Sequence, residues 1–330
     1  MSNFAYIVGV GHFVPDKILT NQDLEQMVDT SDEWITTRTG IKKRHVVQDE
    51  TCSDLALKAS QQALQQAKMD PAELTHIILA TFTPDAYVPN GSTVLQTKLG
   101  LNQIPCFDIN AACTGFLYAL ELARNICLVN PKAQVLVVAS EVLTSRVNFQ
   151  DRSTCVLFGD AAGAVIVSGQ KRENSFQITD VCLKADGSLG PLLSVIGGGS
   201  SHPPRLGLSI DEKYFVQMQG QEVFKHAVRS MASICEEILS KNNLSSQDIN
   251  LFIPHQANIR IIEALAKKLK LPLSNVYVNV QDYGNTSAAS IPLAFSEAYQ
   301  KGKISSGDKV LLVAFGGGFT WGASVLDFIE

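Results

Sequence analysis

The sequence predicts an α/β protein made of two similar halves. In each half a helix, an apolar strand, a second helix and a second apolar strand follow one another in the same order. In the first half these elements are expected at residues 53–68, 76–81, 113 onward and 134–139. In the second half they are expected at residues 220–241, 250–254, 285 onward and 309–314. Apolar strands that alternate with helices are typical of sheets covered by helices on both faces.

The spacing of these elements indicates an internal duplication. Ile77 lies 36 positions before Cys113, and Leu251 lies 36 positions before Ser287. The closing strands of the two halves, VLVVA and VLLVA, differ at one position, and a polar stretch at 170–175 interrupts the apolar pattern between the halves. We therefore expect an N-terminal unit at 1–172, a C-terminal unit at 173–330 and a site between them.

Composition excludes several classes of protein. The chain has 330 residues, of which 45% are hydrophobic and 18% charged, as in one or two well-packed units. A net charge of -5 provides no general attraction to nucleic acid or anionic membranes. The seven cysteines form no CxxC pair, and their odd number argues against a disulfide framework.

The same features predict where the protein works. No basic leader precedes the first apolar strand at 6–10, and we expect no apolar run long enough to span a membrane. The expectation is therefore a cytoplasmic protein that binds neither nucleic acid nor membrane and needs no metal or prosthetic group.

Cys113 stands at a predicted strand-to-helix junction. Apolar residues at 106–109 lead into small residues, and the helical pattern that follows places Phe116 and Leu120 on one face. Unpaired backbone N–H groups and the positive end of the helix dipole would favour the thiolate there and lower the pKa of the thiol. Ala112 and Gly115 would leave room for an acyl group. The alternative is a small buried thiol without chemistry.

Two later segments supply partners for this thiol. The run LFIPHQAN at 251–258 is an apolar strand that ends near His255, and the run YGNTSAAS at 283–290 places Asn285 in a turn before a helix. Each residue also has a structural interpretation, as a hydrogen-bonded interior histidine and as a helix cap. Together with Cys113 they provide a nucleophile, an imidazole and an amide at strand ends and turns, where catalytic groups are commonly presented.

Six segments, in order along nearly the whole chain, match one family. They are DTSDEWITTRTGI at 29–41, ACTGF at 112–116, FGDAAG at 158–163, HQANIR at 255–260, GNTSAA at 284–289 and AFGGGFTWG at 314–322. The chain resembles the thiolase-fold condensing enzymes, and most closely the beta-ketoacyl-acyl-carrier-protein synthase III family. The resemblance implies a thiolase-like, five-layered αβαβα fold of two duplicated halves, and a homodimer.

The resemblance also implies a reaction. Family members initiate fatty-acid synthesis by a decarboxylating Claisen condensation of an acyl-CoA primer with malonyl-acyl carrier protein, giving 3-oxoacyl-acyl carrier protein. Cys113 would carry the acyl group, while His255 and Asn285 would donate hydrogen bonds to the enolate oxygen. Backbone N–H groups of Cys113 and of the glycine loop around Gly317 would hold the second oxyanion, and Phe315 would favour decarboxylation over attack by water.

Binding residues transfer from the family by position. Trp34, Arg38 and Arg152 match contacts to the adenine end of CoA, and Asn258 matches a residue that helps to fix the water or imidazole geometry near the site. A basic stripe for the acidic carrier protein would comprise Lys225, Arg260, Lys267 and Lys268, although a run of charge is also typical of a solvated face.

One position concerns the primer. Val88 stands before a proline where acetyl-preferring members often have phenylalanine, in a loop that caps the partner's acyl pocket in the family. We expect a longer acyl pocket here, unless Tyr87 fills the gap.

Three other functions remain open at this stage. A cysteine hydrolase would share the order Cys113, His255, Asn285, with 142 positions between the first two, within the papain range of roughly 130–150. The papain signature around the nucleophile is absent, however. The second alternative is a non-catalytic scaffold, which would be expected to have lost one of the three residues. A specialised acyltransferase or condensing relative in secondary metabolism is the nearest alternative.

Overall fold

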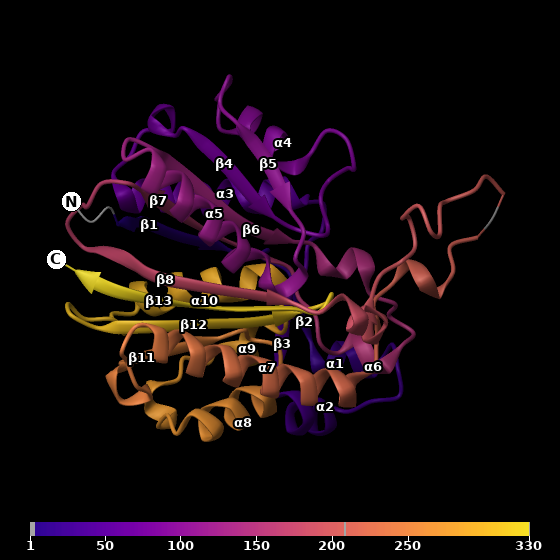
Figure 1. Cartoon of the computed structure of the whole chain (residues 1–330). Helices are drawn as coiled ribbons and strands as arrows, with labels where there is room; N and C mark the ends of the chain where they lie inside the picture. The colour runs from indigo at the N-terminus through magenta and orange to yellow at the C-terminus, as the bar shows by residue number, and fades with distance from the viewer. Residues whose placement is uncertain (1–3, 208, 330) are drawn as a thin grey trace.

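The chain folds around one large sheet. The structure, a computed structural model, describes residues 4–207 and 209–329. Within these residues the main strands are β1 (Ala5–Phe13), β4 (His76–Ala80), β5 (Cys106–Ile109), β6 (Gln134–Glu141), β7 (Ala161–Ser168), β8 (Ser175–Ala185), β11 (Leu251–Pro254), β12 (Lys309–Gly316) and β13 (Thr320–Ile329). They form a nine-stranded sheet in the order β11-β12-β13-β8-β1-β7-β6-β4-β5 (Figure 1).

This sheet has two parts that meet along a short seam. Strands β1 and β8 pair over only three residues, from Ala5 opposite Ile178 to Ile7 opposite Phe176. We call β1, β7, β6, β4 and β5 the N-terminal sheet, and β8, β13, β12 and β11 the C-terminal sheet. In Figure 1 the two parts diverge from the seam and form separate layers with helices between them.

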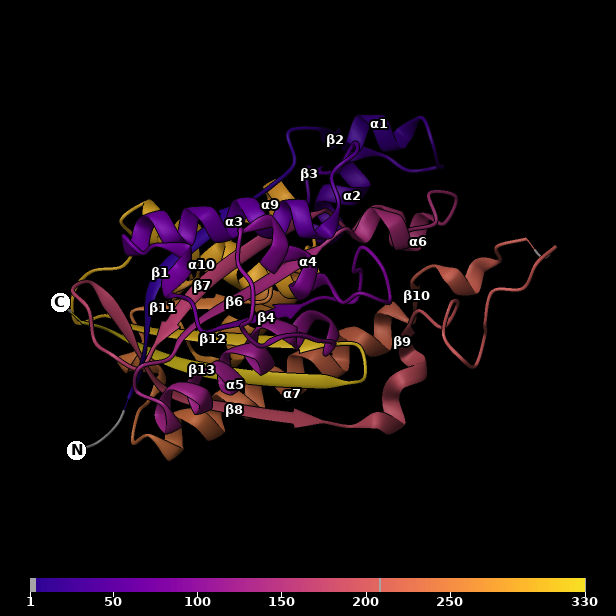
Figure 2. The same ribbon diagram turned by 90° about the horizontal axis from the view of Figure 1, so that it is seen from above.

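Helices fill three further layers. They are α3 (Cys52–Ala67), α4 (Gly91–Lys98), α5 (Gly115–Val129), α7 (Gly220–Lys241), α8 (Ile259–Leu269) and α10 (Ser290–Gln300). Helices α3 and α4 pack on the N-terminal sheet, α5 and α10 contact strands of both sheets, and α7 packs on the C-terminal sheet with α8 against it. The order is helix, sheet, helix, sheet, helix, which confirms the five-layered arrangement (Figures 1 and 2).

Burial explains why the sequence forms these layers. Every residue of β6 is buried, as expected for a strand with helices on both faces. Central helix α10 is buried at each position from Ser290 to Ala298, because sheets cover it on two sides. Outer helix α7 instead buries one stripe, which includes Met231, Ile234 and Ile238, and its other face is solvated.

Shorter elements complete the chain. They are β2 (Ile18–Thr20), β3 (Lys43–His45), β9 (Leu193–Ser194), β10 (Gln217–Met218), α1 (Asn21–Glu25), α2 (Asp32–Thr39), α6 (Arg152–Cys155) and α9 (Val280–Tyr283). The 3₁₀ turns are η1 (Pro71–Glu73), η2 (Ala112–Thr114), η3 (Leu143–Arg146), η4 (Gly187–Leu192), η5 (Glu212–Tyr214), η6 (Ser246–Asp248), η7 (Leu273–Asn275) and η8 (Ser287–Ala289). Residues 195–207 and 209–216, between β9 and β10, extend from the body as an arm (Figures 1 and 2).

One expectation from the sequence is wrong. The segment Ala112–Val129 is long and apolar enough to cross a membrane by length and composition, although we expected no such run. It comprises η2 and α5, whose residues Phe116, Leu117 and Leu120 are buried between the two sheets, so it packs as a core helix.

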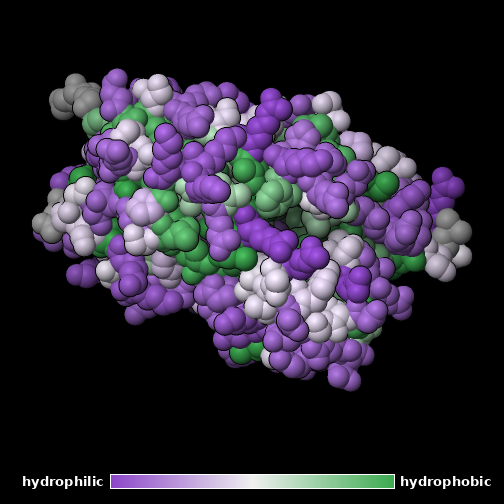
Figure 3. All heavy atoms as spheres, turned by 90° about the horizontal axis from the view of Figure 1, so that it is seen from below, coloured by the Kyte–Doolittle hydropathy of each residue, from purple (hydrophilic) through white to green (hydrophobic). Residues whose placement is uncertain are grey.

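Hydrophilic residues dominate the surface that Figure 3 shows, and hydrophobic residues there form scattered patches.

The two halves repeat a pattern of pairing. Strand β4 pairs in parallel with both β5 and β6, and β11 pairs in parallel with β12, with a single parallel bridge between Phe252 and Val276 on its other side. The polar stretch at 170–175 follows β7 and ends at Ser175, the first residue of β8. The division into 1–172 and 173–330 stays a prediction.

Candidate active site

A single cavity brings together residues from both halves. Its volume is about 910 Å³, and Cys113, His255 and Asn285 all line it. Much of the remaining wall is apolar, with side chains from α7, α8, the arm, β10 and the loop after α6: Leu157, Val195, Val216, Met218, Val223, Phe224, Ala227, Met231 and Ile261. A cavity with an apolar wall and a few convergent polar groups suits a ligand that is partly hydrocarbon.

Cys113 lies in η2, between β5 and α5, as the sequence predicted for a strand-to-helix junction. The turn is fixed to β13, because Thr114 Oγ1 donates to Thr320 O at 3.0 Å and Thr320 Oγ1 donates to Ala111 O at 2.9 Å. Ala112 has φ of 46°, a left-handed conformation that non-glycine residues rarely adopt. The cavity therefore receives the nucleophile from a turn that is held on both sides.

The pKa of Cys113 differs from the sequence expectation. The residue reaches the cavity surface, yet the pKa of its thiol is raised to about 12, mainly by desolvation and to a smaller extent by the charge of Glu141. The positive end of α5 does not outweigh this desolvation. The expectation of a lowered pKa is therefore wrong, and the resting residue is a protonated thiol that needs a proton acceptor.

His255 continues the pairing of β11 with β12 by donating its backbone N–H to Val313 O at 2.8 Å. Its Nδ1 lies 2.5 Å from Ser290 Oγ, on α10. Burial lowers the pKa of the imidazole to about 4, so the ring is neutral near pH 7. When the Ser290 hydroxyl donates to Nδ1, the ring proton is on Nε2, which is then free to donate to a substrate oxygen.

Asn285 is held by its backbone and by its side chain. Its N–H donates to Leu157 O at 2.8 Å, and its carbonyl accepts from Gly159 N at 3.1 Å. Its Oδ1 accepts the backbone N–H of Ser287 at 2.8 Å, which leaves Nδ2 as the uncommitted end of the amide. Two neutral donors, His255 Nε2 and Asn285 Nδ2, therefore remain available in the same cavity as the thiol.

The glycine loop between β12 and β13 packs against the nucleophile. A Cβ on Gly316 would lie 2.7 Å from Cys113 N, so only glycine permits this approach. Gly317 and Gly318 line the cavity, and so does Phe315, whose ring centroid lies 4.6 Å from that of Phe319. The backbone of this loop is thus adjacent to the backbone of η2, which carries the nucleophile.

The residues expected to hold CoA gather at one side of the cavity. Trp34 and Arg38, on α2, and Asn258 line it. The Arg152 guanidinium does not line the cavity but lies 5.2 Å from the centroid of the Trp34 ring. Asn258 caps α8 and donates from Nδ2 to Arg38 O at 3.2 Å, which ties α8 to α2.

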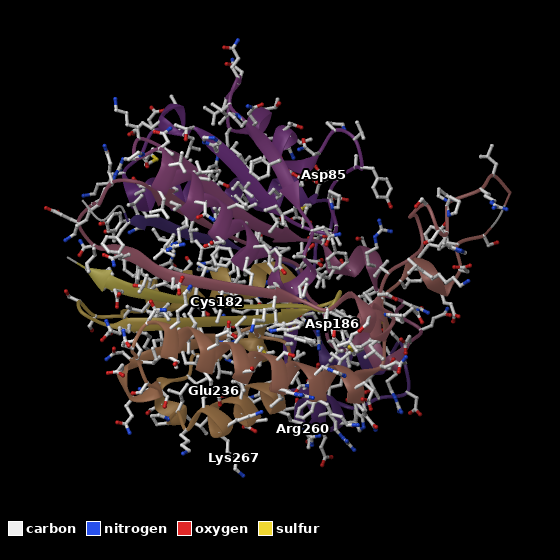
Figure 4. The ribbon with its side chains drawn as sticks, viewed as in Figure 1. Asp85, Cys182, Asp186, Glu236, Arg260 and Lys267 are labelled. Atoms are coloured by element: carbon white, nitrogen blue, oxygen red, sulfur yellow. The ribbon has the colours of Figure 1, made fainter. Side chains whose placement is uncertain are left out.

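The expected basic stripe is only partly assembled. Arg260, Lys267 and Lys268 are exposed on α8, and Figure 4 shows Arg260 and Lys267 at the outer surface of this helix. Lys225 belongs to α7, and its ammonium is paired with Glu222 at 2.7 Å, which neutralises it locally.

Val88 lies outside the cavity of the single chain. Its side chain is 88% exposed and that of Tyr87 71% exposed, in the loop between β4 and α4. A Cβ on Gly198 of the arm would lie 2.5 Å from the Tyr87 hydroxyl, so this loop and the arm are in contact. A role of Val88 in an acyl pocket requires a second copy of the chain and stays a prediction.

Sequence reasoning missed three residues around the site. Ser290 sets the environment of His255 Nδ1, and Ser287 lines the cavity beside Cys113. Glu141, at the end of β6, is completely buried, and burial raises the pKa of its carboxyl to about 7. A glutamate that ends an otherwise apolar strand was a signal in the sequence, and both serines belong to the run at 283–290.

Family models match two stretches of the chain. The model described as 3-oxoacyl-[acyl-carrier-protein (ACP)] synthase III matches residues 107–187, and the model for the C-terminal part of the same enzyme matches residues 239–328.

Full-length relatives agree with these matches. The beta-ketoacyl-[acyl-carrier-protein] synthase III of Oleidesulfovibrio alaskensis is 53% identical over 328 residues, covering 99% of both chains. The chain belongs to the beta-ketoacyl-[acyl-carrier-protein] synthase III family. It is therefore an acyltransferase that performs the condensation that initiates fatty-acid synthesis.

Solved structures confirm the thiolase-like fold of this condensing enzyme. The 3-oxoacyl-[acyl-carrier-protein] synthase III of Aquifex aeolicus is 47% identical, with a TM-score of 0.89 over 98% of this chain and all of that one. The priming beta-ketosynthase of the R1128 polyketide biosynthetic pathway is 32% identical, with a TM-score of 0.90 over 99% of this chain and 97% of that one.

Membership of this family removes the hydrolase alternative, and the site geometry agrees. In a hydrolase the asparagine would orient the histidine. Here, among the described residues, Asn285 Oδ1 bonds to Ser287 and His255 Nδ1 bonds to Ser290, and no hydrogen bond joins His255 to Asn285.

Proposed function

We propose that the chain joins an acyl-CoA primer to malonyl-acyl carrier protein through an acyl-Cys113 intermediate, with His255 and Asn285 as hydrogen-bond donors. One observation carries this assignment. A thiol and two neutral donors, each positioned from a different element, line the same cavity of about 910 Å³. This arrangement suits a reaction in which negative charge develops on a thioester oxygen.

The first half-reaction transfers the acyl group. The Cys113 sulfur attacks the thioester carbon of acyl-CoA, the bond from that carbon to the CoA sulfur breaks, and CoA leaves as a thiol after taking up a proton. Trp34, stacked beside Arg152, offers a flat surface for the adenine ring, and Arg38 provides a positive charge for the phosphates. The apolar wall accommodates the pantetheine arm and the acyl chain.

The second half-reaction forms the carbon–carbon bond. Malonyl-acyl carrier protein loses carbon dioxide, and the enolate oxygen accepts hydrogen bonds from His255 Nε2 and Asn285 Nδ2. The resulting carbanion attacks the acyl carbon on Cys113. Backbone N–H groups of Cys113 and of the loop at Gly317 hold the tetrahedral oxyanion, which collapses to 3-oxoacyl-acyl carrier protein and the free thiol. Phe315 excludes water from the enolate.

The exposed side chains of the surface indicate two protein partners, the carrier protein and a second copy of the chain. The acidic carrier protein docks on α8 through Arg260, Lys267 and Lys268, with Lys225 contributing after its pair with Glu222 opens. The chain works as a homodimer, in which a second copy covers the exposed side chains of Tyr87 and Val88. Seven free cysteines suit a reducing compartment, and we assign the enzyme to the cytoplasm.

A second candidate is initiation of a specialised pathway. The priming beta-ketosynthase of the R1128 polyketide biosynthetic pathway has the same fold, at a TM-score of 0.90, so the fold is compatible with such a role.

Reconstitution tests the proposal. The chain is mixed with single acyl-CoAs from acetyl to octanoyl and analysed by intact-protein mass spectrometry, and malonyl-acyl carrier protein is then added. We expect one acyl mass per chain, followed by its loss and the appearance of 3-oxoacyl-acyl carrier protein with carbon dioxide. Acylation without product on adding malonyl-acyl carrier protein would contradict the condensing role and favour transfer to another acceptor.

A further inference from the structure

Of the two carboxyl oxygens of Glu141, one accepts three hydrogen bonds, and the other accepts none among the described residues. Its Oε2 accepts hydrogen bonds from the hydroxyls of Thr81 at 3.1 Å and Thr83 at 2.6 Å and from the backbone N–H of Phe82 at 3.3 Å. Its Oε1 is buried and has no hydrogen-bond partner among the described residues. A buried acceptor without a partner is costly, so its persistence beside an active site calls for a functional explanation.

Ser287 is near both this carboxyl and the nucleophile. It belongs to η8, which packs against both β6, with Glu141 at its end, and η2, with Cys113. Its hydroxyl lowers the pKa of Cys113 and also that of Glu141, so it is near enough to interact with either group. In the resting structure Ser287 Oγ nevertheless has no well-aligned partner among the described residues. The Ser287 hydroxyl is therefore not committed to either group in the resting structure.

Among the titratable groups near Cys113, Glu141 is the one that can act as a base, because its neighbours are thiols that stay neutral. The titratable neighbours are two thiols, Cys113 on η2 and Cys52 on α3, and the charge of Asp85 also acts on Cys52. Burial raises the pKa of each thiol to about 12, while the pKa of Glu141 is raised only to about 7. No Lys, Arg or His side chain in the described ranges bonds to Glu141.

His255 is a much weaker candidate for this task. Its Nδ1 already faces Ser290, and burial lowers the pKa of its ring to about 4. Burial therefore makes the imidazole a weaker base and the carboxylate a stronger one. In the buried site, two adjacent negative charges are unfavourable, so loss of the proton by Cys113 should be matched by its gain at the carboxyl.

We propose that Glu141 accepts the Cys113 proton through the Ser287 hydroxyl during acylation. As the Cys113 sulfur bonds to the acyl carbon, its proton passes to Ser287 Oγ, and Ser287 passes its own proton to Glu141 Oε1. The carbon–sulfur bond of acyl-CoA breaks, and the proton returns by the same path to the departing CoA sulfur. The negative charge that leaves Glu141 appears on the carbonyl oxygen of the tetrahedral intermediate, and it returns to the carboxylate when CoA leaves as a thiol. Glu141 touches no substrate, so it is a positioning residue that acts through Ser287.

Alkylation of Cys113 by iodoacetamide tests this relay without depending on turnover. The rate is measured between pH 5.5 and 9.5 by mass spectrometry of the Cys113 peptide. In the unaltered chain the rate should rise with pH up to about 7, where Glu141 becomes a carboxylate, and then level off because the pair titrates as a unit. The inference rests on the proposed role of Cys113, so an unreactive Cys113 in the unaltered chain would contradict that role itself.

Two substitutions address the two steps of the relay. Glu141→Gln removes the acceptor with little change of shape, and Ser287→Ala removes only the hydroxyl. Each should slow alkylation at pH 7.5 by about tenfold or more and abolish the levelling near pH 7, so that the rate keeps rising with pH. Acylation by acyl-CoA should lose the same pH step. Cys52→Ala, which removes the other thiol beside Glu141, should leave the profile unchanged.

Opposite outcomes overturn the relay. If Glu141 acts only as a negative charge that suppresses the thiolate, Glu141→Gln will speed alkylation instead of slowing it. If Ser287→Ala keeps the step near pH 7, the proton does not travel through that hydroxyl. Should Glu141→Gln unfold, as judged by its thermal transition, the Ser287→Ala profile decides the question alone.

Discussion

The side-chain oxygen of Asn285 accepts the backbone N–H of Ser287 at 2.8 Å, and this bond determines which end of the amide can serve a substrate. With Oδ1 committed, the Nδ2 donors remain for the enolate oxygen. His255 is held in a similar manner, because its Nδ1 lies 2.5 Å from Ser290 Oγ. The two donors of the site are thus each fixed by a serine that follows Asn285 in the chain.

Acylation should be confined to one of the seven cysteines. Incubation with a short acyl-CoA should add one acyl mass to the chain, since only Cys113 lines the cavity among the described cysteines. Intact-protein mass spectrometry measures this mass. The added mass should vanish in Cys113→Ala. It should persist in Cys52→Ala, which removes a thiol that is as hard to ionise as that of Cys113. An acyl group that remains on the Cys113→Ala chain would refute the assignment.

The two donors should matter more for decarboxylation than for acylation. His255→Ala and Asn285→Ala should each slow decarboxylation of malonyl-acyl carrier protein by about a hundredfold or more, the usual cost of a lost oxyanion donor. Release of labelled carbon dioxide measures this step, and the acyl mass on Cys113 measures the other. Asn285→Asp keeps an acceptor for Ser287 N–H but lacks the donors, so it should be as slow as Asn285→Ala. Equal damage to both steps would instead indicate that His255 activates the thiol.

The basic surface of α8 should affect only the second substrate. Arg260→Glu should raise the KM for malonyl-acyl carrier protein by about fivefold at low salt, the value of an exposed ion pair, and less at high salt. Priming by acyl-CoA should be unchanged. Lys303→Glu makes the same change of charge at an exposed position far from α8 in sequence and serves as control. A similar loss with both substrates would mean that Arg260 is structural.

Primer preference should depend on Val88 of a second copy of the chain. A valine leaves more room than a phenylalanine, and each additional buried methylene contributes about 0.8 kcal/mol, or about fourfold in rate. The unaltered enzyme should therefore prime with butyryl- or isobutyryl-CoA at least as well as with acetyl-CoA. Val88→Phe should shift the profile toward acetyl-CoA in competition assays.

Val129→Phe is the matched control for this change, because Val129 is also 88% exposed but lies at the end of α5. It should leave the primer profile as it is. A strong preference of the unaltered enzyme for acetyl-CoA, or a profile that Val88→Phe does not move, would contradict the prediction.

The sequence by itself determined the layers and the family. Strand β6 reads as a continuous apolar run because it is covered on both faces, and the equal spacing from Ile77 to Cys113 and from Leu251 to Ser287 reflects two halves with the same order of elements. Local pattern is enough for such features, since periodicity and turn residues act over a few positions. It also placed Cys113 at the junction where the structure has it.

Tertiary structure alone decided the electrostatics of the site. The sequence predicted a lowered pKa for Cys113 from its place before α5, but desolvation and the charge of Glu141 raise it. Glu141 comes from β6, Ser287 from η8 and Ser290 from α10, so their meeting depends on how both sheets pack around the central helices. Burial and the direction of a side chain are properties of the packed layers, and no short stretch of sequence contains them.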